Sequence, residues 1–251
     1  MTRTFGRRCI PAKLGRAPAF EFVAREGGSA LVVVLAALVG LTTLGAALTL
    51  TTATEVGVAV NFRASNEALY AAEAVLERAI ADLPALDWNH VLDGSAPSTF
   101  VDGPPGMRHA GDSPIDLLQM LNVLNCEKTT ACSIGEMNAV SAQRPWGVNN
   151  PRWQPFAYGP IADLLPGQAV VSPYYGFVLV ADDPSETDGD PLHDGSTPGN
   201  PGSGVIALRA YAFGPRGARR VVAATLARSG DPAAAGVLPV PARMVSWREI
   251  R

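Results

Sequence analysis

A stretch without charge, from Gly27 to Thr54, constrains this chain more than any other feature of its sequence. Its apolar part, Ser29 to Leu50, has 22 residues, and about 20 are enough for an α-helix to cross the hydrocarbon core of a bilayer. A helix satisfies its own backbone donors and acceptors, so it is stable in lipid. We therefore expect a helix that enters or crosses a membrane.

The residues before this stretch predict its orientation. They include six basic residues against two acidic ones: Arg3, Arg7, Arg8, Lys13, Arg16 and Arg25 against Glu21 and Glu26. An excess of Lys and Arg keeps its side of a membrane helix in the cytoplasm. A cleaved secretory signal is the alternative, but its apolar region has only about 7–15 residues. The candidate cleavage site Gly45-Ala46-Ala47 is weak.

The helical pattern continues beyond the apolar run. Proline is absent from Ser29 to Leu83, and Pro84 then ends the pattern. Within 55–83, Leu69, Leu76 and Ile80 recur at helical spacing. We expect one continuous helix over 29–83, apolar on all sides in 29–54 and amphipathic in 55–83. The amphipathic half needs a folded domain to cover its apolar stripe.

The remainder is expected to form one exported α+β domain. Of the chain's 25 Gly and 21 Pro, 14 Gly and 15 Pro lie within 84–204, so we expect 84–173 to be loop-rich. A short helix is expected over 114–121, with Ser113 as its N-cap. We expect 174–251 to be β-rich, with strands at 174–181, 205–213 and 219–227. The last two of these should form a hairpin, and the tail, 244–250, is a further candidate strand. A small antiparallel sheet of this kind would bury one face on the amphipathic helix.

The N-terminal third also resembles a known family. The segment 25–35 looks like the leader junction of type IV prepilins, a basic leader that ends in glycine before an apolar run. Residues 25–83 resemble PilX-type minor pilins in the order of several motifs: Leu41-Thr42-Thr43-Leu44, Thr51-Thr52-Ala53-Thr54-Glu55, Asn61, and Ala71-Ala72-Glu73-Ala74. The resemblance implies a pilin-like fold, with the long helix packed on the sheet.

This resemblance implies a processing site. A prepilin peptidase would cut after Gly28, remove the leader 1–28, and methylate the new N-terminus at Ser29. Two features depart from the usual pattern. Val33 stands where most pilins carry a glutamate, a lack shared with PilX-type pilins and with the K-type pseudopilin of type II secretion. The leader is also long, which a start codon placed too far upstream would explain.

The implied function is that of a minor pilin, which primes assembly of a type IV pilus or shapes its tip. Expected partners are other minor and major pilins, the prepilin peptidase, the inner-membrane assembly platform, and membrane lipid before assembly. The expected location is the bacterial inner membrane, with the C-terminal domain in the periplasm, and later the fibre. The alternatives are a K-like pseudopilin and a membrane-anchored periplasmic binding domain.

Two cysteines would remain after processing, Cys126 and Cys132, in a domain expected outside the cytoplasm. Oxidising compartments favour disulfides, so we predict that these two are paired. A metal pair and free thiols are the alternatives. A metal site is disfavoured because no further cluster of Cys and His lies nearby in the sequence.

An acidic segment, 182–194, carries six carboxylates interspersed with glycine. Hard cations such as calcium prefer oxygen ligands, which makes a calcium site one reading. Its candidate ligands are Asp182, Asp183, Asp188, Asp190 and Asp194. The order of residues is not that of an EF-hand, and a solvated loop between two strands is the alternative.

A second segment, 144–158, combines prolines with aromatic residues. Its rings are Trp146, Trp153, Phe156 and Tyr158. Such rings either close a loop-rich core or present a binding surface. We expect the former.

Other functional classes receive little support. The net charge of −3 gives no reason to expect nucleic-acid binding. His90, His109 and His193 are scattered and form no metalloprotease motif, and neither a nucleophile elbow nor a P-loop occurs. We therefore expect no enzyme, and no cofactor other than the calcium considered above.

Overall fold

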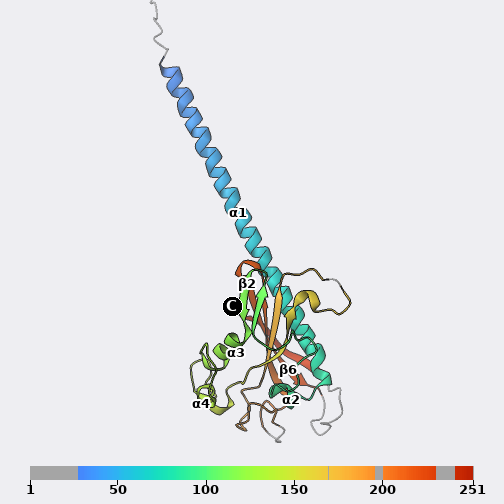
Figure 1. Cartoon of the computed structure of the whole chain (residues 1–251). Helices are drawn as coiled ribbons and strands as arrows, with labels where there is room; N and C mark the ends of the chain where they lie inside the picture. The colour runs from blue at the N-terminus through green and yellow to red at the C-terminus, as the bar shows by residue number, and fades with distance from the viewer. Residues whose placement is uncertain (1–27, 169, 196–199, 230–240, 251) are drawn as a thin grey trace, which may run out of the picture. The chain divides into compact units, whose positions relative to one another are not determined.

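The computed structural model describes residues 28–168, 170–195, 200–229 and 241–250 (Figure 1). The chain divides into two units, Met1–Glu55 and Val56–Arg251. The α-helices are α1 (Ser29–Asp82), α2 (Trp88–Leu92), α3 (Leu117–Cys126) and α4 (Ile134–Asn138). The strands are β1 (Met107–Ala110), β2 (Ser113–Asp116), β3 (Gln154–Pro160), β4 (Tyr175–Asp182), β5 (Val205–Phe213), β6 (Arg219–Arg228) and β7 (Ala242–Ile250). Short 3₁₀ turns occupy Leu83–Ala85, Gly147–Asn149, Ile161–Asp163 and Pro215–Gly217.

The described part of the first unit is the N-terminal half of α1. Large apolar side chains are exposed all around it, among them Leu31, Leu38, Leu44 and Leu48. Its threonine hydroxyls donate to carbonyls three or four residues earlier in the helix, as Thr42 does to Val39 at 2.9 Å. By length and composition this helix can cross a membrane, with a mean hydropathy of 2.5 in its most apolar window.

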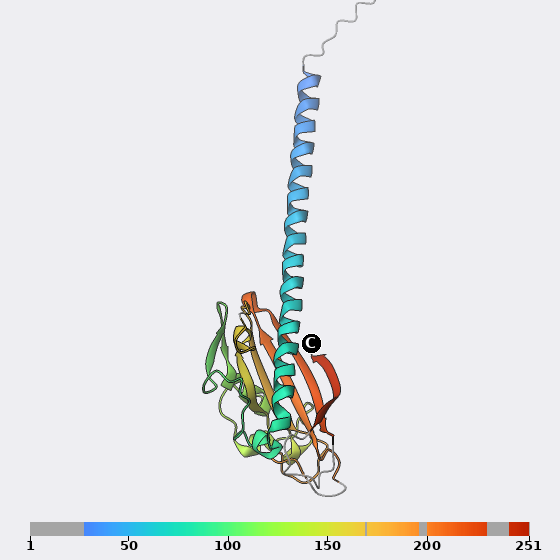
Figure 2. The same ribbon diagram turned by 90° about the vertical axis from the view of Figure 1, so that its right-hand side faces the viewer.

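The second unit is built on a five-stranded sheet in the order β3-β4-β5-β6-β7 (Figure 2). Every neighbouring pair is antiparallel. The predicted hairpin is confirmed, since Phe213 of β5 pairs with Arg219 of β6. The tail also forms a strand, β7, at the edge of the sheet beside β6.

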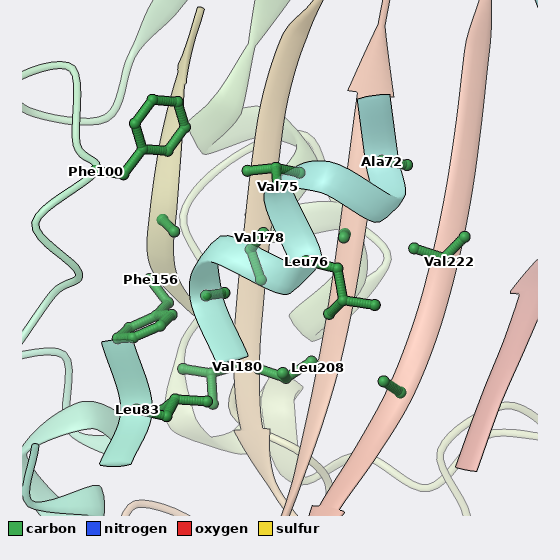
Figure 3. Close-up of a cluster of buried hydrophobic side chains, with 14 of the residues drawn as sticks. Ala72, Val75, Leu76, Leu83, Phe100, Phe156, Val178, Val180, Leu208 and Val222 are labelled. Carbon is green, nitrogen blue, oxygen red and sulfur yellow. The ribbon is translucent and has the colours of Figure 1, made fainter. Parts of the chain in front are cut away.

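The C-terminal half of α1 packs on one face of this sheet (Figure 3). It presents small and branched side chains, including Ala72, Val75 and Leu76, to a sheet surface that includes Val178, Leu208 and Val222. Alternate residues of a strand point to the same face, which explains why the even-numbered positions of β4 and β5 form this core. The predicted amphipathic helix over 55–83 is thereby confirmed, with its buried stripe beginning at Ala68.

The opposite face of the sheet is covered as well. Odd-numbered residues, such as Phe177 and Tyr211, pack there with Leu117 of α3 and Ile115 of β2. As a result all eight residues of β4 are buried. We expected the sheet to bury one face, and the second layer comes from the region that we expected to be loop-rich.

Two expectations for that region were wrong. The helix predicted over 114–121 starts at Leu117, because Ser113 and Pro114 belong to β2. Asp116 rather than Ser113 caps it and accepts a hydrogen bond from the Gln119 N–H at 3.0 Å. The boundary at residue 174 was also wrong, since β3 belongs to the sheet and lies before it.

Candidate functional site

The expected processing site lies at the start of α1. Ser29 is the first residue of the helix, and both Gly28 and Ser29 are exposed. Val33 is exposed too, in the first turns of the apolar half. The rest of the expected leader, with Cys9, lies outside the described residues. Among the described residues, none therefore covers the two that flank the expected cleavage site.

The predicted disulfide is present. Cys126 ends α3 and is bonded to Cys132, with 5.9 Å between their Cα atoms. The bridge precedes Ser133, which caps α4 by accepting a hydrogen bond from the Glu136 N–H. It therefore ties the two short helices outside the sheet to each other.

Most of the aromatic segment belongs to the core. Trp153, Phe156 and Tyr158 are buried on or next to β3, which agrees with the core interpretation. Trp146 instead stays 43% exposed. It borders a groove of about 1000 Å³ beside α3 and the sheet, in which the Arg209 guanidinium lies 4.8 Å from the centre of the Trp153 ring.

The acidic segment brings three carboxylates together. Asp182 ends β4, while Glu186 and Asp194 lie on the connection between β4 and β5. One oxygen from each lies within 4.8 Å of the others. Asp182 and Glu186 are 3% and 2% exposed, which is unusual for acidic residues. We call these three residues the carboxylate cluster.

The hydrogen bonds of the cluster are incomplete. Glu186 Oε2 accepts from the Gly195 N–H at 2.9 Å and from the Asn200 side-chain amide at 3.2 Å. Asp194 Oδ1 accepts from the Gly204 N–H at 2.6 Å. No described donor reaches Asp182 Oδ1 or Glu186 Oε1, although both atoms are buried. Asp182 and Glu186 thus each have one carboxylate oxygen without a hydrogen-bond donor among the described residues.

Positive charge reaches the cluster from β6. Arg228 Nη1 lies 3.5 Å from Asp194 Oδ2, and the same guanidinium lies over the ring of Trp88, 4.4 Å from its centre. One cation cannot balance three carboxylates. The imbalance is strongest at Asp182 and Glu186, which form no ion pair among the described residues.

The electrostatics reflect this crowding. Burial, followed by repulsion from Glu186, raises the pKa of Asp182 to about 9. Burial also raises the pKa of Glu186 to about 7, with repulsion from Asp194 and Asp188 adding to the effect. The pKa of Asp194 is raised by burial, against hydrogen bonding to Gly204 and attraction to Arg228. Without a cation the cluster favours bound protons.

The structure divides the five predicted ligands. Asp182 and Asp194 belong to the cluster, and Asp188 lies beside it, where its charge helps to raise the pKa of Glu186. Asp183 and Asp190 lie outside it: Asp183 accepts from the Ser185 N–H at 3.0 Å, and Asp190 contacts His193 Nδ1 at 2.9 Å. Both therefore serve local turns. The sequence pattern did not single out Glu186, since nothing in it marks this residue as buried.

Comparison with known proteins adds no further constraint. No family model, no curated protein and no solved structure matches the chain.

Proposed function

We propose that this protein is a minor pilin of the PilX type, a structural subunit of a type IV pilus. The observation that supports this proposal is the division of α1 into two surfaces. Its apolar side chains are exposed up to Phe62, whereas from Ala68 onwards one stripe is buried by the sheet of the same chain. A pilus subunit needs both surfaces.

The exposed half suits an exchange of environment. Before assembly it would lie in the lipid of the inner membrane, and after assembly it would pack among the equivalent helices of other subunits. Both environments are apolar, and neither satisfies free backbone or hydroxyl groups. Thr42, Thr43 and Thr49 bond their hydroxyls within the helix, so this half requires no water.

The proposed place in the fibre is the tip or the initiation complex. Most pilins carry a glutamate that pairs with the N-terminal amine of a neighbouring subunit. At the corresponding position this chain has Val33. An unpaired carboxylate in lipid is costly, and its absence suits a subunit that does not need this pairing. The expected partners are other minor and major pilins, the assembly platform and the prepilin peptidase.

A second candidate shares this observation. Val33 equally suits a K-like pseudopilin of type II secretion. This residue therefore does not distinguish a subunit of a type IV pilus from one of a type II secretion system. A membrane-anchored periplasmic binding domain, unrelated to any fibre, is the third candidate. It would keep its leader or lose it to ordinary signal peptidase.

The test is the chemical state of the N-terminus. Mass spectrometry of the protein from cells with and without prepilin peptidase should show a methylated Ser29 that depends on this enzyme. Gly28→Asn should block processing. Gly57→Asn, at a helix position that also has open space around it, should not. An intact leader in wild-type cells, or a cut near residue 45, contradicts the proposal.

A further inference from the structure

We propose that the carboxylate cluster of Asp182, Glu186 and Asp194 binds a calcium ion that holds the β4–β5 connection against the sheet. This inference does not rest on the proposed pilus function. Its starting point is the two oxygen atoms, Asp182 Oδ1 and Glu186 Oε1, that are buried without a hydrogen-bond donor among the described residues.

The first argument is the balance of charge. Three carboxylates share a space in which their oxygens lie within 4.8 Å of one another, and Asp188 adds a fourth beside them. Arg228 is paired with Asp194. Buried charges are stable when paired or when they coordinate a metal. A divalent cation would supply the missing charge and give the two free oxygens a partner.

The second argument identifies the cation. All three side chains are carboxylates, which are hard oxygen donors, while zinc sites are usually built with His or Cys. Calcium takes 6–8 oxygen ligands in a flexible geometry and accepts bidentate carboxylates. Magnesium demands a near-ideal octahedron and keeps several waters. It is therefore less suited to Asp182 and Glu186, which are almost completely buried.

The third argument concerns what the ion would hold together. Asp182 belongs to β4, and Asp194 lies near the start of β5, where it accepts from Gly204. The connection is also bonded to other elements: the Asp194 N–H donates to Asn89 Oδ1 of α2 at 2.9 Å, and the Gly189 N–H donates to Asn149 Oδ1 at 2.8 Å. A bound ion would fix the centre of this network, so binding should stabilise the folded domain.

The experiment is thermal unfolding of the full-length protein in detergent, in EDTA and in millimolar CaCl₂. Calcium at about a hundred times its Kd should raise Tm by about 5–10 °C. Titration calorimetry should give one calcium per chain. MgCl₂ should give a smaller shift. Absence of a calcium-dependent shift together with absence of binding heat would overturn the proposal, and an equal response to magnesium would overturn the choice of ion.

Variants separate a bound ion from a general salt effect. Glu186→Gln should abolish the calcium-dependent rise. It should also raise Tm in EDTA, because it removes a charge from a crowded buried site. Asp190→Asn, an exposed position outside the cluster, should respond to calcium as the wild type does. If Glu186→Gln retains the calcium response, the assignment is wrong. If Glu186→Gln folds poorly, Asp182→Asn serves as the second variant, and calorimetry should show that it too has lost calcium binding.

Discussion

At the scale of single residues, the burial of Glu186 depends on the backbone that surrounds it. The Gly195 N–H donates to its carboxylate. A Cβ atom at Gly195 would collide with the carboxylates of both Glu186 and Asp188 and would come within 2.7 Å of the Asn200 amide. A larger residue here would force these side chains to move, and Glu186 has little room to do so because it is buried.

We therefore predict that Gly195→Ala disrupts the cluster. The added methyl group should push Glu186 away from its donors, with a loss of stability of about 1–3 kcal/mol. The measurement is chemical denaturation in EDTA, with calorimetry for the loss of calcium binding. Gly135→Ala in α4, where nothing lies within 4 Å of the new atom, is the matched control and should be neutral or slightly stabilising. Normal stability and calcium binding in Gly195→Ala would contradict this account.

At the scale of elements, the decisive contact is that of α1 with the sheet. The helix lies very close to β4 at Gly176, where a Cβ atom would lie 2.9 Å from Val75 Cβ. Tyr174, just before β4, donates its hydroxyl to the Ala64 carbonyl at 3.0 Å. Small side chains on the buried stripe, such as Ala68 and Ala72, complete this close packing.

Gly176→Ala should therefore separate the helix from the sheet locally. Overpacking of a well-filled core costs about 1–3 kcal/mol, and denaturation of the full-length protein in detergent measures it. The double variant Gly176→Ala with Val75→Ala should recover part of the loss, because the smaller helix residue makes room. Strict additivity of the two single effects would show that the two positions do not interact.

At the scale of the whole molecule, the two units differ in whether the chain itself covers their apolar side chains. The domain after Val56 has a sheet covered on both faces by its own chain. The apolar half of α1 leaves side chains such as Leu38 and Leu44 more than half exposed. We expect lipid or other helices to cover this surface, because exposed apolar patches of this extent are unfavourable in water.

We predict that Leu38→Arg releases the protein from the membrane or prevents its insertion. An arginine near the centre of a membrane helix costs about 2.5–3.5 kcal/mol on the insertion scale. Membrane fractionation of cells that produce the variant measures the effect. Val140→Arg, at an exposed apolar position of the domain, is the control and should remain in the membrane fraction. An unchanged distribution of Leu38→Arg would show that this helix is not the anchor.

Much of this architecture was predictable from local pattern. The proline-free run up to Leu83 predicted a single helix, and α1 together with the following 3₁₀ turn covers it. The β5–β6 hairpin followed from two β-rich runs separated by a turn segment. The pair Cys126 and Cys132 followed from their nearness and the expected compartment. Each depends on residues that are close together in the chain.

The rest needed tertiary contacts. The sequence over 114–121 predicts a helix, but its first residues belong to β2 instead. The reason is that Ser113–Asp116 pairs with β1 and that Ile115 packs on the sheet. The prolines around Trp153 and Phe156 gave no reason to predict a strand. Residues Gln154–Pro160 nevertheless form β3, which extends the sheet.

The sequence by itself determined the membrane-type helix, the amphipathic stripe and the β-rich end, since these depend on the order of apolar and polar residues. Only the tertiary structure decided which carboxylates meet. Asp182 and Asp194 are joined by Glu186, whereas Asp183 and Asp190 lie outside the cluster. The physical reason is that burial and missing hydrogen-bond donors arise from the packing of segments far apart in the chain, here β4, its connection to β5, and Arg228 of β6.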